Sequence, residues 1–429
     1  MRNEKHRATS SRLFSIPNDW ILTKLGACVE IRGSKRLSFK DKKIPFIPME
    51  LIPTESVYVK YELKKPQEIK SFTYCEAGDL LLAKITPSLE NGKQGIVPQD
   101  IPNGFALATT EVFPLQSKKE KILNLFLFYL LKTPRFRNVL ITSMIGTTGR
   151  QRASKEALLS LPIPLPPLSE QKKIAEILST VDEAIEVTDK EIEKAESLKR
   201  GLMQELLTKA IGHSRFKKTE VGTIPEEWEV VRVEKIFDVY GGTTPSTNNP
   251  SFWDGEILWV TPTDITKLGN RIYLNDTERK ISEEGLKKSN LKLLEPFTIL
   301  LTTRATIGYA ALSPKQLTIN QGMTAFIPLK KDLINPVFYI YWFSKIRDFL
   351  LQLGGGSTFK EVSRTTLKKL YVPLPPLPEQ KKIAEILSSV DDFIESLRAR
   401  REKLVKLKQG LMEDLLTGKR RVKIDAEDT

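Results

Sequence analysis

Histidine and cysteine are nearly absent from this sequence of 429 residues, which contains two of each. Cys28 and Cys75 lie far apart and do not have the spacing of metal ligands. His6 and His213 lie in polar connecting segments. A zinc site or a histidine-based catalytic dyad therefore has almost no residues from which it could be built, and we expect neither a metal nor a cofactor.

Long apolar runs are also missing. No stretch approaches the roughly 18 apolar residues that a membrane-spanning helix requires, and the N-terminal MRNEKHRATSSR is polar and basic, unlike a signal peptide. We therefore expect a cytoplasmic protein that makes no use of a membrane. The length is sufficient for two ordinary domains, each with a core of its own, plus connectors.

The most informative feature that is present is a repeat. LPPLSEQKKIAEILS (Leu165 to Ser179) returns almost unchanged as LPPLPEQKKIAEILS (Leu374 to Ser388). From Leu165 to Thr208 and from Leu374 to Thr417, 28 of 44 positions are identical without a gap, at a constant offset of 209 residues. The chain is therefore a duplicated unit of about half its length.

Each copy of the repeat predicts one long helix. The prolines before it exclude helix there, because proline lacks an N–H donor and crowds the preceding turn. Apolar residues then recur at heptad spacing, which is typical of a coiled coil. They are Ile174, Leu178, Val181, Ile185, Ile192, Ala195, Leu202 and Leu206 in the first copy, and Ile383, Leu387, Val390, Ile394, Leu397, Leu404, Leu411 and Leu415 in the second.

Two such helices in one chain favour packing on each other, antiparallel if a pseudo-twofold axis relates the halves. The alternative is a helix that recruits another protein, and the two interpretations are compatible. Gly201 and Gly410 occupy the same place in both copies, in KRGLMQELLT and KQGLMEDLLT. Glycine inside a helix costs about 1 kcal/mol relative to alanine. It either ends the helix or permits close approach of two backbones, and the repetition favours close approach.

Charge of one sign gathers outside these helices. The chain carries a net +14, while residues 170–208 carry a net −4 and residues 379–417 none, so the remainder holds +18. Positive charge on the globular parts and connectors is typical of proteins that contact a phosphate backbone, although many basic proteins do not.

The globular halves predict mixed α/β domains. Each begins with Ile-Pro and a tryptophan, Trp20 or Trp228, which we interpret as a core anchor, followed by a short helix and a strand. Short strands follow at 45–48, 57–61, 79–85 and 111–115, and at 257–261, 271–274, 298–303 and 323–329. Residues 122–141 and 336–353 then predict buried amphipathic helices. The halves align poorly here, as expected of a duplicated scaffold whose remaining parts have diverged.

Polar loops in each half provide side chains that reach phosphates and base edges. One loop follows a predicted strand, and another, rich in glycine and hydroxyl groups, precedes the long helix. Neither has the GxxxxGK[ST] pattern of a nucleotide-binding loop, and a plain hinge is the alternative for the second. The candidate DNA-binding residues are Lys84, Thr86, Ser88, Asn91, Lys93, Arg150, Arg152, Thr243, Thr244, Thr303, Arg304, Thr306, Ser357, Thr358 and Lys360.

Several stretches together resemble the specificity subunit of type I restriction–modification systems. They are LPPLSEQKKIAEILSTVDEAI and LPPLPEQKKIAEILSSVDDFI, GLMQELLT and GLMEDLLT, LLAKITPSLENGK, GGTTPS followed by ILWVTPTDI, and GGGSTFKEVSRTTLKKL. The resemblance implies two target-recognition domains, each reading one half of a split double-stranded DNA site. It also implies that two modification (methyltransferase) subunits dock on the long helices and that restriction subunits join them. This chain would then be a non-catalytic subunit.

The resulting domain plan has two target-recognition domains separated by two long antiparallel helices. It comprises a polar tail (1–13), target-recognition domain 1 (14–160), helix and spacer 1 (161–210), a linker (211–223), target-recognition domain 2 (224–369), helix and spacer 2 (370–418) and a tail (419–429). Two other functions have some support. Asp264 with Glu278 and Lys280, and Glu50 with Glu62 and Lys64, loosely match a metal-dependent nuclease, and the helices alone would suit a coiled-coil assembly protein.

Overall fold

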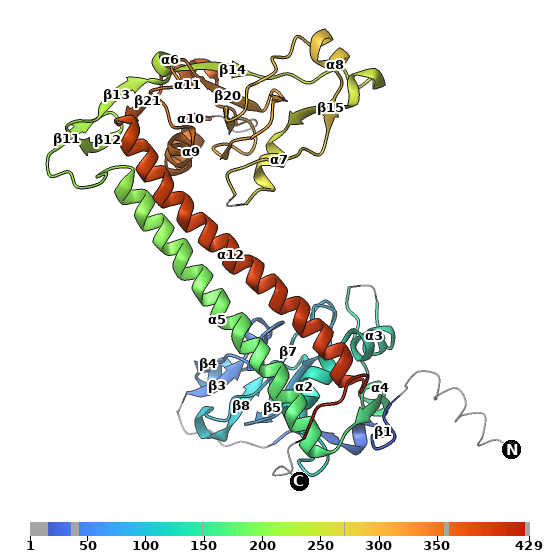
Figure 1. Cartoon of the computed structure of the whole chain (residues 1–429). Coiled ribbons are helices and arrows are strands. Elements are labelled where there is room, and N and C mark those ends of the chain that lie inside the picture. Colours follow the sequence, from blue (N-terminus) through green and yellow to red (C-terminus); the bar gives the residue numbers. More distant parts are fainter. Residues whose placement is uncertain (1–15, 36–42, 148, 270, 356–359, 425–429) are drawn as a thin grey trace. The chain divides into compact units, whose positions relative to one another are not determined.

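The computed structural model describes residues 16–35, 43–147, 149–269, 271–355 and 360–424. The chain divides into two compact units (Figure 1). The first comprises residues 1–187 and 401–429, and the second comprises residues 188–400. Each unit therefore contains one globular half of the sequence together with a portion of both long helices. Among the helices of the described residues, none has the length and continuous apolar character of a membrane-spanning segment.

The first unit contains two four-stranded sheets. One is antiparallel, in the order β2 (Val29–Ile31), β9 (Val112–Ser117), β6 (Leu80–Ala83) and β7 (Gln94–Ile96). The other has the order β4 (Glu62–Lys64), β3 (Ile44–Ile47), β8 (Phe105–Ala108) and β5 (Thr73–Glu76). In the second sheet β3 and β8 run parallel, and the other neighbours are antiparallel.

The second unit repeats this topology. Its four-stranded sheet has the order β14 (Phe237–Gly241), β20 (Met323–Pro328), β17 (Ile299–Thr302) and β18 (Ala310–Ala311). A three-stranded sheet has the order β16 (Lys280–Ile281), β15 (Trp253–Val260) and β19 (Leu317–Ile319), with β15 and β19 parallel. Two similar mixed α/β domains are thus confirmed, although their sequences align poorly.

The predicted buried helices are each broken in two. Pro134 divides the first into α2 (Asn124–Lys132) and α3 (Pro134–Thr142), because proline disfavours helix in the residue before it. The second is divided into α9 (Pro336–Lys345) and α10 (Arg347–Leu353), where the backbone of Ile346 leaves the helical region. Six residues of α2 and six of α9 are buried, and so these two helices form the centre of each core.

The start of each domain differs from the prediction of a helix followed by a strand. A strand comes first: β1 (Ile21–Lys24) pairs with β10 (Pro162–Leu165), and β13 (Glu229–Arg232) pairs with β21 (Tyr371–Leu374). A short helical turn then leads to β2 or, through α6 (Val233–Ile236), to β14. The partner strand lies about 140 residues away, and local sequence pattern does not report such a pairing.

Smaller elements complete the two units, most of them in the second. The hairpin of β11 (Phe216–Thr219) and β12 (Gly222–Pro225) precedes its domain. The short helix α7 (Pro262–Thr266) follows β15, and α8 (Glu283–Lys288) follows β16. Two further short helices, α4 (Lys155–Ser160) in the first unit and α11 (Arg364–Lys369) in the second, precede β10 and β21.

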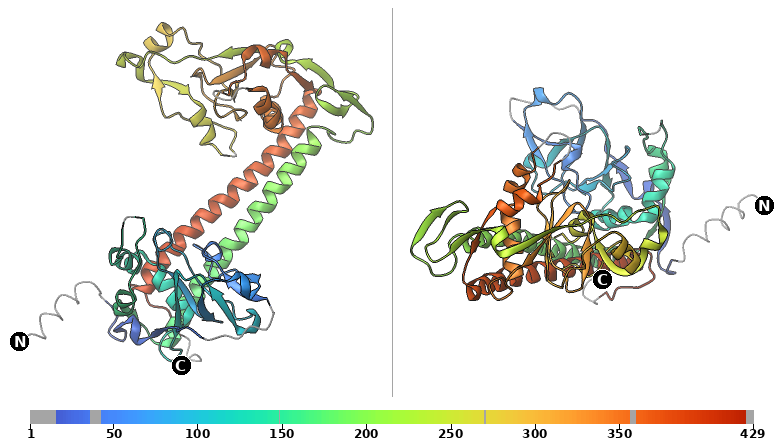
Figure 2. Two further views of the ribbon diagram at one scale, coloured as in Figure 1. Left: turned by 180° about the vertical axis from the view of Figure 1, so that it is seen from behind. Right: turned by 90° about the horizontal axis from the view of Figure 1, so that it is seen from above.

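The long helices α5 (Leu168–Leu206) and α12 (Leu377–Leu416) pair antiparallel in each unit (Figure 1, Figure 2). In the second unit, Glu196 bonds to Arg398 and Lys199 to Asp391, so one residue number rises as the other falls. The predicted seam residues are buried or partly buried in both helices. The coiled-coil prediction is therefore confirmed.

Gly201 and Gly410 serve neither of the purposes suggested by the sequence. Both lie inside their helices, and both are exposed. A Cβ atom added at either position would meet no described atom within 4 Å. The expected close approach of two backbones is therefore wrong, and each glycine instead leaves an open notch on the helix surface.

The first turn of each long helix anchors its domain. Trp20 and Trp228 are buried, as predicted, and their indole nitrogens donate to Glu170 (2.9 Å) and Glu379 (2.8 Å). Both glutamates also bind a basic side chain. Arg421 donates to Glu170 at 2.7 Å, and His213 bonds to Glu379. The neighbouring glutamines, Gln171 and Gln380, are fully buried and bond to backbone groups before α2 and α9.

Candidate nucleic-acid interface

Two loops that the sequence identifies separately lie side by side in the first unit. Residues 84–93 follow β6, and residues 150–154 precede α4. Ile85 and Arg152 form an antiparallel bridge. The backbone N–H of Thr86 donates to Gln151 (3.1 Å), and that of Ala153 donates to Lys84 (2.8 Å). Candidate residues about 60 positions apart are thereby brought into one surface segment.

The second unit builds the same arrangement. Arg304, after β17, forms an antiparallel bridge with Glu361, before α11. The backbone N–H of Ala305 donates to Lys360 (3.1 Å), and that of Val362 donates to Thr303 (2.9 Å). Since the two loops hardly resemble their counterparts in sequence, the shared pairing is a property of the fold and their side chains are free to differ.

The arginine candidates and Lys360 are exposed to solvent. The exposed candidates are Asn91, Arg150, Arg152, Thr243, Arg304, Thr306 and Lys360. Arg152 forms an ion pair with Glu111, and Arg304 lies 3.9 Å from Glu361, so both guanidinium groups are held at the surface by a carboxylate. Such arginines can exchange a weak exposed ion pair for a phosphate.

Two other basic candidates are partly withdrawn. The Lys84 ammonium lies 5.3 Å from the centre of the Phe113 ring, and burial lowers the pKa of Lys84 although nearby Glu111 acts to raise it. The Lys93 ammonium donates to the carbonyl of Met49 at 2.6 Å. Both side chains would have to leave these contacts before they could reach a ligand.

The remaining candidates support the loops from within or lie elsewhere. Ser88 and Thr303 are buried, and Thr303 bonds to Gly322 and Thr324. Thr86 donates to Glu90 at 2.8 Å, and Thr244 donates to Gln321. Ser357 and Thr358 lie outside the described residues.

Several of these segments line a cavity of about 420 Å³ in the second unit. Its lining includes Arg304, Lys360, Asn320 and Gln321. The two amides were missed by sequence reasoning, although the turn Asn-Gln-Gly between β19 and β20 was a usable signal. Three sequence segments, around residues 304, 320 and 360, thus contribute polar groups to one concave surface. A fourth segment joins them from outside the lining, because Gln321 accepts a hydrogen bond from Thr244.

Two buried tryptophans hold one of these segments in place. Trp259 donates to the carbonyl of Thr243 and Trp253 to that of Ser246, both at 3.1 Å. The exposed Arg279 stacks on Trp253, with its guanidinium carbon 3.5 Å from the ring centre. Sequence reasoning missed this cluster, because the pairing of β15 with β16 that assembles it is not visible as a local motif.

The residues of the nuclease-like pattern have structural partners. The Asp264 carboxylate is buried and accepts from the N–H and hydroxyl of Thr261 and from the N–H of Glu278. Glu278 instead forms an ion pair with Lys267. Among the described residues, no group of three or more histidine, cysteine, aspartate or glutamate side chains is arranged to hold a metal ion.

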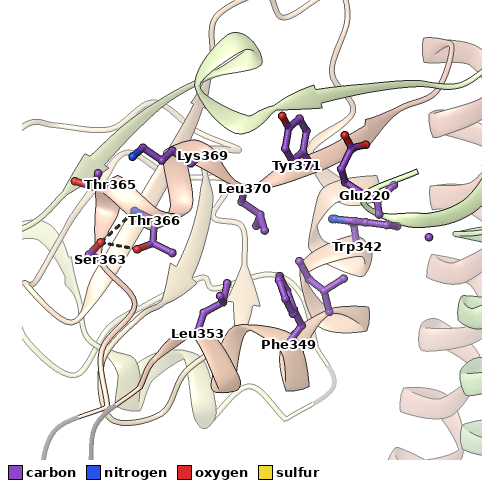
Figure 3. A pocket seen from close by; sticks show the side chains of 13 residues that line it. Glu220, Trp342, Phe349, Leu353, Ser363, Thr365, Thr366, Lys369, Leu370 and Tyr371 are labelled. Atoms are coloured by element: carbon purple, nitrogen blue, oxygen red, sulfur yellow. Dashed lines mark hydrogen bonds between the residues drawn. The ribbon is translucent and has the colours of Figure 1, made fainter. Parts of the chain in front are cut away.

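A larger cavity, about 810 Å³, has a different chemistry (Figure 3). Apolar side chains from α9, α10 and β21 dominate it, among them Trp342, Phe349 and Leu353, and Lys369 is the one cation in its lining. The buried indole nitrogen of Trp342 has no hydrogen-bond partner among the described residues. A DNA backbone requires several cations, so this cavity does not fit it, and the loops described above remain the candidate interface.

The comparisons with known proteins agree with this picture. A family model, the type I restriction modification DNA specificity domain, matches twice, at residues 17–197 and 225–406. The putative type I restriction enzyme MjaX specificity subunit of Methanocaldococcus jannaschii is 33% identical over 418 residues, covering 95% of each chain. The MjaVIII specificity subunit of the same organism is 30% identical over 432 residues, covering 95% of this chain and 94% of that one.

Solved structures share the fold. A chain from a study of assembly and conformational transition of the type I R-M system has a TM-score of 0.60 at 18% identity, with 94% of this chain and 99% of that chain covered. The S subunit of a type I restriction-modification system from M. genitalium has a TM-score of 0.55 at 15% identity, covering 94% and 98%. At these identities the likeness concerns the architecture alone.

Proposed function

Because the chain carries two copies of the type I restriction–modification DNA specificity domain and belongs to that family, we propose that it reads a bipartite DNA site with one domain on each half. It is a specificity subunit, and its role is sequence recognition. The observation that supports the two-reader arrangement is the loop pairing built twice, once at Ile85 and Arg152 and again at Arg304 and Glu361. Each copy presents exposed cations beside polar side chains.

The chemistry of these surfaces suits duplex DNA. Guanidinium and ammonium groups of Arg150, Arg304 and Lys360 would contact phosphates, which position a protein on DNA without reading its sequence. Amide side chains read bases, since asparagine or glutamine can bond in a bidentate manner to the major-groove edge of adenine. Asn320 and Gln321 stand beside the cations in the second unit and are the candidates for that readout.

The catalytic steps would belong to partners. We propose that two modification subunits dock on the long helices, that restriction subunits join them, and that this chain supplies no catalytic group. Leu198 and Leu407, which are related by the repeat offset, are 56% and 51% exposed. Each lies three residues before a glycine notch, at Gly201 and Gly410. Two exposed leucines at equivalent places in the repeat suit two copies of one partner.

The proposal is tested on the complex reconstituted with its modification subunits. Arg304→Ala and Lys360→Ala should each weaken DNA binding about tenfold, and a lost phosphate contact should reduce the salt dependence of binding by about one ion. Lys287→Ala is the matched control, because Lys287 lies on α8, is 77% exposed and pairs with Glu283. Affinities that equal this control's at every salt concentration would contradict the assignment of the interface.

A further inference from the structure

A largely buried ion pair joins three elements of the first unit. The hydroxyl of Tyr129, on α2, donates to Asp182 of α5 at 2.8 Å. Lys408 of α12 lies 2.5 Å from the other carboxylate oxygen and 5.7 Å from the centre of the Tyr129 ring. The side chains of Lys408 and Asp182 are only 13% and 16% exposed. The globular domain is thereby bonded to one long helix, which is bonded in turn to the other.

The second unit contains the same cluster with the helices exchanged. Tyr341, on α9, donates to Asp391 of α12 at 2.8 Å, and Lys199 of α5 lies 2.5 Å from Asp391. The Lys199 ammonium is 5.4 Å from the Tyr341 ring centre. Asp182 and Asp391 are separated by the repeat offset of 209 residues, as are Lys199 and Lys408. Burial raises the pKa of Tyr341, so its hydroxyl stays protonated and donates.

Such a cluster is sensitive to register. A charge taken out of water costs several kcal/mol unless a partner compensates it, and removal of one partner from a buried pair is strongly destabilising. An apolar seam, in contrast, tolerates a shift of one turn, because its apolar positions recur every three or four residues and the next layer presents similar side chains. A shifted helix pair would leave Asp391 or Lys199 buried without its counter-ion. The buried charges therefore select one register, as a buried polar residue does in coiled coils.

We propose that the two Tyr–Asp–Lys clusters are register locks that position each recognition domain on the helix pair and so set the number of unread base pairs between the half-sites. This inference rests on the proposed bipartite reading. Tyr129 and Tyr341 are positioning residues, since each acts on DNA only through the placement of its domain. The second cluster is the simpler one to test, because it has no second cation at the equivalent position: the uncharged Ser344 stands at the position that Lys132 occupies beside the first cluster.

The test uses DNA libraries in which the two half-sites are separated by spacers of different length. The reconstituted wild-type complex should methylate one spacer length. One helical turn spans about 5.4 Å, and one base pair about 3.4 Å. In Asp391→Asn, methylation of spacers one or two base pairs longer or shorter should therefore rise at least tenfold relative to the native spacer, with unchanged half-sites. The double variant Lys199→Met with Asp391→Asn should regain thermal stability, because no charge is buried, while keeping the relaxed spacer. A purely stabilising ion pair would recover both properties together.

Further variants cover other outcomes. Tyr341→Phe removes only the hydroxyl and should relax the spacer even where Asp391→Asn does not fold. Glu191→Gln is the control, because Glu191 and Arg400 form an exposed pair at 3.6 Å on the same helices. A double variant and a Tyr341→Phe variant that both keep the single native spacer would overturn the locks.

Helix register can also be measured in the chain alone, independently of DNA reading. Cysteines at 191 and 400 should be joined by a short thiol cross-linker in the otherwise native chain, and cysteines at 191 and 396, one turn away, should not. With Lys199→Met and Asp391→Asn the second cross-link should appear. Native register in the charge-free chain would overturn the lock, whereas a register change in a chain whose wild-type complex shows no bipartite motif would overturn the proposed function only.

Discussion

At the residue scale, the two domains solve the same anchoring problem with different chemistry. Glu170 receives the Trp20 indole and Arg421, whereas Glu379 receives the Trp228 indole and His213. Arginine keeps its charge at any ordinary pH, but histidine does not. The second anchor is therefore titratable and the first is not. The sequence placed His213 in a polar connecting segment and revealed nothing of the two carboxylates that meet there.

The histidine predicts a pH dependence of stability. Burial acts to lower the pKa of His213, but its hydrogen bonds to Glu379 (2.8 Å) and Glu227 (2.5 Å) outweigh this effect and raise it above 6.5. A raised pKa in the folded state means that the stabilisation is complete below about pH 6.5 and is lost as pH rises through the folded-state value. The melting temperature of the chain should fall between pH 6 and pH 9 for this reason.

His213→Arg should remove that dependence, because it reproduces the chemistry of Arg421. The measurement compares melting temperatures of the wild-type chain and His213→Arg at pH 6 and pH 9. We expect the two to be similar at pH 6, and the variant to be more stable at pH 9. Equal slopes for both proteins would show that other groups cause the pH dependence.

At the scale of elements, the long helices were predicted well because their information is local. Heptad spacing, preceding prolines and an ungapped repeat all act within one segment. The strands whose partners lie far away in sequence are predicted less well. The local pattern indicates helix where β1 lies, and the predicted strand from Val57 to Tyr61 contains only a single bridge residue, Tyr58, before β4. The candidate loops were found by composition, but their side-by-side placement depends on long-range pairing that no local pattern contains.

The glycine notches predict opposite effects on the chain and on its complex. Gly201→Ala should raise the free energy of unfolding by about 1 kcal/mol, since alanine has the higher helix propensity and its Cβ meets no described atom. Because we propose that a modification subunit packs on this face, the same change should weaken assembly. Urea denaturation and a titration with the modification subunit measure the two quantities.

Ser197→Ala is the control for this pair of measurements, because Ser197 is also exposed on α5. It should change both quantities by less than Gly201→Ala. If Gly201→Ala stabilises the chain and assembly is normal, the docking surface lies elsewhere. If Gly201→Ala destabilises the chain, the added Cβ meets atoms of the chain itself and the notch is not open.

At the scale of the whole molecule, the duplication separates what is shared from what differs. The topology, the anchors and the buried Tyr–Asp–Lys clusters recur in both units, whereas the exposed loop residues do not. Arg152 in the first unit faces Glu111, while Arg304 in the second faces Glu361, on a different element. A fold that keeps its frame constant and varies its loops can change one half of a composite target without disturbing the other.

This separation predicts the result of exchanging one domain. Residues 224–369 are replaced by the matching segment of the M. jannaschii relative that is 33% identical, with Trp228 and Tyr341 kept as tryptophan and tyrosine. These two side chains bond to Glu379 and Asp391, which stay in the chain, so the new domain should be seated as the old one was. Methylated motifs of the reconstituted complex should then change in one half-site only, with the other half-site and the unread spacer preserved.

The corresponding exchange of residues 14–160 should alter the opposite half-site. The contacts that hold each domain on the helices lie within its own unit, so an exchange should leave the other domain in place. If either exchange changed both half-sites, the two domains would not be independent readers.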